Sequence, residues 1–164
     1  MSNSDFTVPD ICDAHGDKIA IGDIFLTSYG GIEKFFGEIR TVDCPHSNSV
    51  VKELVQENGE GKVLVINHSG DKLCSMVGDQ IAQKAYENNW KGIFVNGYIR
   101  DIEVIKNISI GVCAKNAFPM KTNKAVGVGT KDTSFKIGSV EISSGNWIYV
   151  DTNGWVVSQN KLEF

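Results

Sequence analysis

The middle of the chain alternates between strand-like and helix-like patterns of apolar residues. A continuous apolar run, Val63–Ile66, lies between Gly61 and Gly70, which is typical of a β-strand that is covered on both faces. Residues 79–89 then place apolar side chains at helical spacing, and residues 91–97 form another short β-rich run that ends in glycine. This order predicts a strand, a helix and a second strand.

The amino-terminal part of the chain carries the signals of a short opening helix. Pro9 suits the first turn of a helix, and Thr7 or Asp10 can cap it. We expect this helix to continue to about His15 and to end at Gly16.

Residues 37–59 predict a step from a strand to a helix. The segment 37–44 reads as a strand. Ser47 or Asn48 can cap the helix that follows, whose apolar residues share one face and whose terminator is Gly59.

The pattern changes towards the carboxyl terminus. Residues 101–108 can form one or two helical turns, and the alternation in residues 109–116 is typical of a half-buried strand. Residues 134–159 contain strand-like runs separated by Gly, Ser, Asn and Asp clusters, so we expect β-hairpins or a meander there. The whole chain, residues 1–164, is therefore predicted to be a single layered α/β domain with a β-rich carboxyl-terminal part.

Composition and charge exclude several classes of protein. The 41% of hydrophobic and 22% of charged residues are ordinary for a globular protein. The net charge is −4 and the basic residues are scattered, which disfavours a direct nucleic-acid partner. Because the amino terminus does not read as a signal peptide and no apolar run is long enough to cross a bilayer, we expect a cytoplasmic protein without membrane contact.

Cysteine and histidine spacing gives no sign of a metal or redox centre. The four cysteines include no CxxC pair, so we expect reduced and mostly buried thiols. The histidines His15, His46 and His68 show no ligand spacing, and structural or surface roles are favoured for them.

One charged constellation has a spacing with chemical content. Residues 80–99 separate Asp79 from Arg100 and Asp101, which is enough for one helix and one returning strand. A helix of about eleven residues is about 16 Å long and a strand of about five residues is about 17 Å long. The helix start and the strand end should therefore meet at one rim of the sheet.

Such a meeting point suits a carboxylate ligand and a hard cation. Free N–H groups at a helix start bind anions, and the Arg100 guanidinium can fork onto a carboxylate. Asp101 supplies an oxygen ligand for Mg²⁺ or Mn²⁺, which keep several waters when bound. The alternative is that Arg100 and Asp101 form a solvated surface pair and that Asp79 only caps a helix.

Several motifs resemble one known family. The chain resembles the RraA-like family, which holds the regulator of ribonuclease E activity A and the class II 4-hydroxy-4-methyl-2-oxoglutarate aldolases. The similar motifs are "DICDA" at 10–14, "GEIRTV" at 37–42, "GEGKVLVI" at 59–66, "GD" at 78–79, "NGYIRD" at 96–101 and "DTNGWVV" at 151–157. The most specific feature of the resemblance is the spacing of twenty residues between Asp79 and the pair Arg100 and Asp101.

The resemblance implies a fold, an assembly and roles for site residues. The implied fold is a compact layered β/α/β domain, similar to a swivelling domain and often assembled as a homotrimer. Arg100 would hold the pyruvate portion of the substrate, and Asp101 would anchor a divalent cation, Mg²⁺ or Mn²⁺, largely through waters. Gly78, Asp79, Gln80 and Ile81 would form a cradle for the substrate carboxylate.

The expected activity is retro-aldol cleavage of 4-hydroxy-4-methyl-2-oxoglutarate, or of a related 4-hydroxy-2-oxo acid, to pyruvate. Oxaloacetate decarboxylation is expected as a second activity of the same site. A water held by the cation or by Arg100 is expected to accept the substrate proton, with Asp79 as the second candidate. Two alternatives stay open: a non-catalytic regulator that binds ribonuclease E or its helicase partner, and a small-molecule binder that has lost the chemistry.

Overall fold

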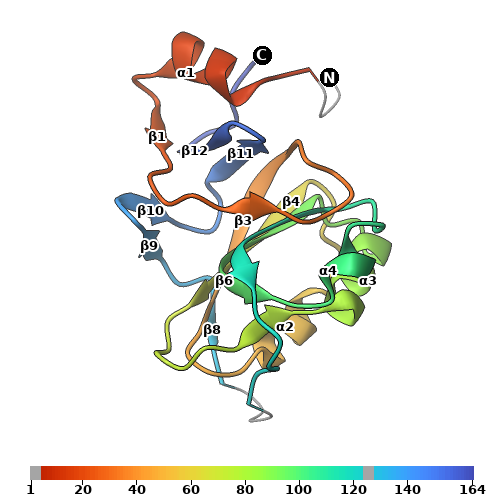
Figure 1. Ribbon diagram of the computed structural model, residues 1–164. Coiled ribbons are helices and arrows are strands. Elements are labelled where there is room, and N and C mark those ends of the chain that lie inside the picture. The colour runs from red at the N-terminus through yellow and green to blue at the C-terminus, as the bar shows by residue number, and fades with distance from the viewer. Residues whose placement is uncertain (1–4, 124–127) are drawn as a thin grey trace.

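The computed structural model describes residues 5–123 and 128–164, in which four helices and twelve strands are present (Figure 1). The helices are α1 (Val8–His15), α2 (Ser49–Leu54), α3 (Asp79–Glu87) and α4 (Ile102–Ile105). The strands are β1 (Ile19–Ile21), β2 (Thr27–Ser28), β3 (Phe35–Cys44), β4 (Lys62–His68), β5 (Ser75–Val77), β6 (Gly92–Ile99), β7 (Gly111–Ala117), β8 (Thr130–Lys131), β9 (Phe135–Ile137), β10 (Val140–Ile142), β11 (Trp147–Asp151) and β12 (Gly154–Ser158).

A ten-stranded mixed sheet organises the molecule. Its strand order is β1-β12-β11-β3-β4-β6-β7-β2, and β5 and β8 pair with β6 and β3 outside this path. The strands β3, β4, β6 and β7 are parallel neighbours, whereas the pairs that β1, β2, β11 and β12 form are antiparallel. The short strands β9 and β10 form a separate antiparallel hairpin. The parallel centre brings the carboxyl ends of β3, β4, β6 and β7 to one edge.

The two faces of the central strands are covered by different elements. One face packs under the helices, with Leu64, Ile66 and Val95 in a core cluster that also contains residues of α2 and α3. The other face packs against β9 to β12, with Val63, Val65 and Phe94 in its cluster. The four residues Val63–Ile66 are fully buried, which confirms the prediction of a strand covered on both sides. The predicted mixed α/β class is confirmed.

The opening helix has the predicted position and cap. The side chain of Thr7 accepts a hydrogen bond from the N–H of Asp10, and α1 ends at His15 before Gly16. Its start is also tied to the carboxyl-terminal hairpin, because the N–H of Val8 donates to Oδ2 of Asp151 over 2.8 Å. Helix α1 shares a hydrophobic cluster around Tyr149 with Phe6 and Leu162.

The helix α2 is shorter than the sequence predicts. It ends at Leu54 instead of continuing to Gly59, because the N–H groups of Gln56 and Glu57 bond to carbonyls only three residues back. The carbonyl of Val55 accepts a bond from the side chain of Asn88, and that of Glu57 accepts one from the indole of Trp90. These side chains satisfy carbonyls that a longer helix would have used.

The strand β7 also differs from its predicted half-buried character. Gly111, Val112, Cys113 and Ala114 are all buried, and only the last three residues of β7 are exposed. The first half of the strand lies between the helix layer and the β9–β12 layer, so it is covered on both faces. The carboxyl-terminal hairpins, β9–β10 and β11–β12, are present as predicted.

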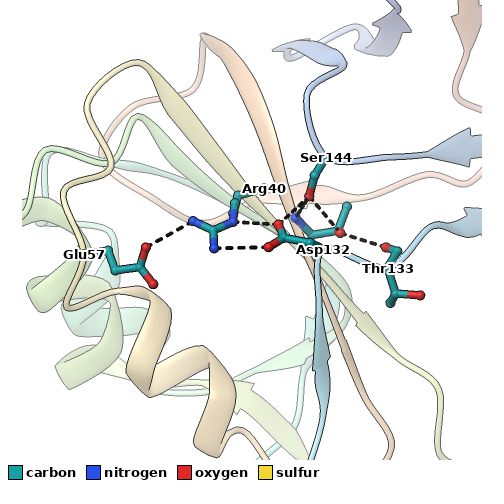
Figure 2. Close-up of polar contacts among 6 residues, drawn as sticks. Arg40, Glu57, Asp132, Thr133 and Ser144 are labelled. Atoms are coloured by element: carbon teal, nitrogen blue, oxygen red, sulfur yellow. Dashed lines mark hydrogen bonds and ion pairs between the residues drawn. The ribbon is translucent and has the colours of Figure 1, made fainter.

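An ion-pair network joins β3 to the segment after β8 (Figure 2). The guanidinium of Arg40 forks onto Asp132, with distances of 2.7 and 3.2 Å, and also contacts Glu57 at 3.1 Å. Asp132 additionally accepts a bond from Ser144, whose hydroxyl receives the backbone N–H of Thr41. The hydrogen bond from Arg40 lowers the pKa of Asp132, and the bond to Asp132 raises the pKa of Arg40.

The cysteines are free thiols, as expected. Cys44, Cys74 and Cys113 are buried and Cys12 is half-buried. Burial raises the pKa of Cys44 and of Cys113 to about 12, so both stay protonated at neutral pH.

No helix in residues 5–123 or 128–164 is long and apolar enough to cross a membrane.

Candidate active site

The predicted site residues lie where two neighbouring parallel strands end. Strand β5 pairs with β6 in parallel, with Val77 opposite Ile99, and the N–H of Arg100 donates to the carbonyl of Val77 over 3.0 Å. Directly after these strands, Gly78 leads into α3 and Arg100 leads into α4. The pairing of β5 with β6 therefore places the two motifs side by side.

The carboxylate of Asp101 is anchored to the start of α3. Its Oδ2 accepts the backbone N–H of Asp79 over 3.1 Å. Asp101 adopts a left-handed conformation, φ 60° and ψ 37°, which Asp and Asn tolerate better than most residues. Its own carbonyl accepts the N–H groups of Val104 and Ile105, so the same residue begins α4. Side chain and backbone together fix the position of this carboxylate.

Gly78 makes room for that carboxylate. A Cβ atom at position 78 would lie 2.7 Å from Oδ2 of Asp101, closer than such atoms approach in folded proteins. The backbone of Gly78 is extended, with φ −119° and ψ −168°, so the need for glycine comes from the contact with Asp101 and not from backbone strain.

A cleft of about 480 Å³ opens beside this contact. All six predicted site residues line it: Gly78, Asp79, Gln80, Ile81, Arg100 and Asp101. The other lining residues are Asn48, Lys52, Val55, Gln56, Ser75, Lys84, Lys121, Thr122 and Asn123. The two motifs that lie apart in the sequence thus share one solvent-accessible cavity.

Several residues that line the cleft belong to none of the predicted site motifs. Asn48 donates to the carbonyl of Met76 over 2.9 Å, and it accepts the hydroxyl of Thr122 over 3.0 Å. Asn48 therefore joins the start of α2, strand β5 and the segment after β7. Only the helix-cap signal at Asn48 was visible in the sequence, and here its side chain binds neighbouring segments instead of capping α2.

The cleft is more positive than the protein as a whole. Four cationic side chains line it, Lys52, Lys84, Arg100 and Lys121, against the two carboxylates of Asp79 and Asp101. The whole chain carries a net charge of −4. A cationic cavity on an acidic protein attracts small anions to that one place.

Two kinds of donor for an anion meet in the cleft. The first three N–H groups of α3 have no partner within the helix, because the intrahelical bonds begin with Ala82 donating to the carbonyl of Gly78. Asp101 takes the N–H of Asp79, which leaves those of Gln80 and Ile81 for a ligand. Arg100 uses one donor on the carbonyl of Pro119 at 3.3 Å, and its other N–H groups suit a carboxylate.

The donor set fits a hydrated divalent ion better than a tightly held metal. The described residues contain no group of three or more His, Cys, Asp or Glu side chains that could enclose a metal. Asp101 offers an anchored carboxylate whose Oδ1 makes no hydrogen bond to another described residue. One or two carboxylates and several waters are the usual environment of Mg²⁺ beside a chelating substrate. Asp101 could hold such an ion.

Another groove is larger but chemically less organised. It measures about 1190 Å³ and lies between β1 and the carboxyl-terminal residues, with His15 and Glu163 on its walls. None of the six predicted residues lines it. The smaller cleft is the better candidate for an active site because free backbone donors, a guanidinium and an anchored carboxylate converge there. None of the three histidines lines that cleft.

Comparisons with known proteins identify relatives over nearly the whole chain. The model of the RraA-like family, described as Aldolase/RraA, matches residues 8–157. A protein from Marinomonas sp. (strain MWYL1) is 43% identical, over 94% of this chain and 96% of its own, and bears the name "Putative 4-hydroxy-4-methyl-2-oxoglutarate aldolase". A protein of the same name from Pseudomonas putida (strain W619) is 38% identical over 96% of both chains.

Solved structures show the same fold. A structure described as S-adenosylmethionine: 2-dimethylmenaquinone methyltransferase from Geobacillus kaustophilus superimposes with a TM-score of 0.92 at 34% identity, covering 96% of this chain and 97% of that one. The RNA-processing inhibitor RraA from Thermus thermophilis superimposes with a TM-score of 0.91 at 28% identity, covering 96% and 95%. The chain therefore belongs to the RraA-like family.

Proposed function

We propose that this protein is a divalent-metal-dependent lyase that cleaves 4-hydroxy-4-methyl-2-oxoglutarate, or a related 4-hydroxy-2-oxo acid, to pyruvate by retro-aldol chemistry. The observation that carries the proposal is the convergence, in one cleft, of the anchored Asp101 carboxylate, the Arg100 guanidinium and the free N–H groups of α3. The names of the relatives at 38 and 43% identity support the same activity.

In this proposal the substrate carboxylate next to the keto group lies at the start of α3. The N–H groups of Gln80 and Ile81 donate to it, and the positive end of the helix dipole adds to the attraction. Arg100 donates to the carboxylate and the keto oxygen from the side of β6. These contacts orient the 2-oxo acid so that the bond between C3 and C4 faces the rest of the cleft.

Asp101 holds the divalent cation in this proposal. When bound, Mg²⁺ or Mn²⁺ acts as a Lewis acid for the negative charge that develops on the keto oxygen as the carbon–carbon bond breaks. The hydrogen bond from the N–H of Asp79 fixes the Asp101 carboxylate at the start of α3. Arg100 contributes a second positive charge to the same oxygens.

A proton must leave the C4 hydroxyl of the substrate as the bond between C3 and C4 breaks, and C3 of the resulting enolate must take up a proton to give pyruvate. A water oriented by Arg100 is the proposed acceptor, and Asp79, which also lines the cleft, is the second candidate. Loss of CO₂ from oxaloacetate develops the same charge on the same keto oxygen. The site should therefore also decarboxylate oxaloacetate.

The experiment that tests this proposal follows pyruvate with a coupled assay. Purified protein is given 4-hydroxy-4-methyl-2-oxoglutarate or oxaloacetate, with Mg²⁺ or with excess EDTA. Metal-dependent pyruvate release from both substrates supports the lyase. Release that EDTA leaves unchanged, or no release above the protein-free background, rejects it.

A second candidate function is regulation of a ribonuclease by direct binding. It is favoured by the structural similarity to the RNA-processing inhibitor RraA, at a TM-score of 0.91. A pull-down with purified ribonuclease E, and an assay of its cleavage rate with and without this protein, tests that candidate. Binding and inhibition without pyruvate release would favour the regulator, whereas pyruvate release without binding would favour the lyase.

A further inference from the structure

Two lysines extend the positive charge of the cleft away from Arg100 and Asp101. Lys52 belongs to α2 and Lys84 to α3, and both line the cleft. The sequence motif did not include them. Their positive charge would suit a second negative group on the substrate.

The spacing on α3 places Lys84 one helical turn from the carboxylate cradle. Gln80 and Lys84 are four residues apart, so they share one face of the helix and are separated by about 6 Å along its axis. In and around α2, Asn48, Lys52 and Gln56 also recur at intervals of four residues and line the same cleft. Lys84 therefore lies one turn beyond the cradle, and Lys52 lines the same cleft from α2.

Within the described residues, neither lysine is held by a close ion pair. The ammonium of Lys84 lies 3.9 Å from Glu87, at the limit of an ion pair, and its side chain is 44% exposed. Lys52 is exposed and forms no ion pair with another residue of the described chain. Lys121 adds a third exposed ammonium to the rim of the cleft.

We propose that Lys84 and Lys52 bind a second carboxylate of the substrate, at the end of the molecule remote from the 2-oxo acid. The two carboxylates of an extended five-carbon dicarboxylate are about 5 Å apart, close to the rise of about 6 Å along α3 between Gln80 and Lys84. This inference rests on the proposed function, because the proposed function places the 2-oxo acid end of the substrate at the start of α3. It assigns to these lysines the selection of acidic over neutral 2-oxo acids.

Ligand binding tests this assignment without requiring turnover. Calorimetry compares 2-oxoglutarate with 2-oxopentanoate, which has the same number of carbons but no second carboxylate, both in the presence of Mg²⁺. The native protein should bind 2-oxoglutarate more tightly by roughly 10- to 100-fold, the range for hydrogen bonds to charged groups. Lys84→Gln and Lys52→Gln should each reduce that ratio, and the double variant should bring it close to one.

Three controls separate the assignment from general damage. Lys84→Arg keeps the positive charge and should retain most of the preference. Lys106→Gln removes an exposed lysine that does not line the cleft and should leave the ratio unchanged. Added NaCl should diminish the preference, because partly exposed charges are screened by salt.

The outcomes distinguish this inference from the lyase proposal. Equal affinity for the two acids in the native protein, or a ratio that Lys84→Gln and Lys52→Gln leave unchanged, would overturn the role of the lysines. Absence of pyruvate release from 4-hydroxy-4-methyl-2-oxoglutarate, together with a lysine-dependent preference for 2-oxoglutarate, would reject the lyase and keep the dicarboxylate site.

Discussion

The backbone N–H of Asp79 donates to Oδ2 of Asp101 over 3.1 Å, across 22 positions of the chain. This hydrogen bond joins the first residue of α3 to the residue that precedes α4. It also means that the metal-binding candidate and the anion-binding helix start are mechanically coupled. A substitution at Asp79 or Asp101 should therefore shift the position of the other residue.

Asp101→Asn should abolish metal-dependent pyruvate release and leave the fold intact. Asn also tolerates the left-handed backbone at this position and can still accept the N–H of Asp79, but its side chain is neutral. Activity should fall by at least about 100-fold, as expected when a charged ligand is lost. The coupled assay with a Mg²⁺ titration measures this, and circular dichroism monitors folding.

Glu103→Gln provides the matched control for that variant. Glu103 is an exposed carboxylate two residues beyond Asp101, and it does not line the cleft. Its substitution should leave turnover within about twofold, because exposed charges outside a site interact weakly with it. Equal losses in both variants would show that net charge, and not a metal ligand, is responsible.

The two arginines of the chain should respond differently to substitution by lysine. Arg100→Lys should lower kcat/KM on the order of 100-fold with little change in stability, because an ammonium cannot reproduce the forked contact to a carboxylate. Arg40→Lys should do the reverse. It weakens the fork onto Asp132, so it should lower the free energy of unfolding by about 1 kcal/mol and leave turnover nearly unchanged.

Urea denaturation and steady-state kinetics on the same two variants measure this contrast. Near-normal kinetics in Arg100→Lys would indicate that Arg100 is only a surface cation. A large loss of turnover in Arg40→Lys would indicate that the network in Figure 2 supports the site as well as the fold.

Gly78→Ala should impair the site through Asp101. The new methyl group would meet Oδ2 of Asp101 at 2.7 Å and displace the carboxylate, while the extended backbone at position 78 accepts alanine without strain. We expect that a higher Mg²⁺ concentration is needed for half-maximal activity and that activity falls. The melting temperature should change little. Gly16→Ala, at the end of α1, is the control and should leave the Mg²⁺ requirement unaltered. An unaltered requirement in Gly78→Ala would contradict the proposed role of the contact.

The stability of the protein should depend on the ionisation of Asp132 in acid. Arg40 holds the pKa of Asp132 below its ordinary value of 3.8. A lowered pKa in the folded state contributes stability above the unfolded pKa and loses it as the pH falls through the folded value. Because the Asp132 side chain is 43% exposed, solvent screening limits the contribution to about 1 kcal/mol.

Asp132→Asn isolates this contribution, because Asn also tolerates the left-handed backbone at position 132, where φ is 61°. The difference in unfolding free energy between native protein and variant should be present at pH 7 and shrink at pH values well below 3.8. A difference that stays constant through the acid range would show that the ion pair is not its source.

Much of the candidate site could be predicted because it depends on local lengths. The helix α3 and the strand β6 together return the chain to the edge of the sheet where α3 starts. The number of residues between Asp79 and Asp101 is therefore enough to predict that the two residues lie close together. The apolar run Val63–Ile66 likewise identified a strand buried on both faces. Both features follow from short stretches of sequence.

The features that the sequence did not predict depend on contacts between distant segments. The end of α2 is set by the side chains of Asn88 and Trp90, and the burial of the first half of β7 is set by layers that pack on both sides of it. Lys52 and Lys84 come from separate helices and line the same cleft. No local periodicity marks such partners, so only the folded arrangement reveals them.

The central claim is that Asp101, fixed at the start of α3, holds a divalent ion that the reaction needs. It is tested most directly by the Mg²⁺ dependence of pyruvate release from 4-hydroxy-4-methyl-2-oxoglutarate, measured in the native protein and in Asp101→Asn. Release that rises with Mg²⁺, stops with EDTA and is lost in Asp101→Asn is the predicted result. Equal, metal-independent release by both proteins would contradict it.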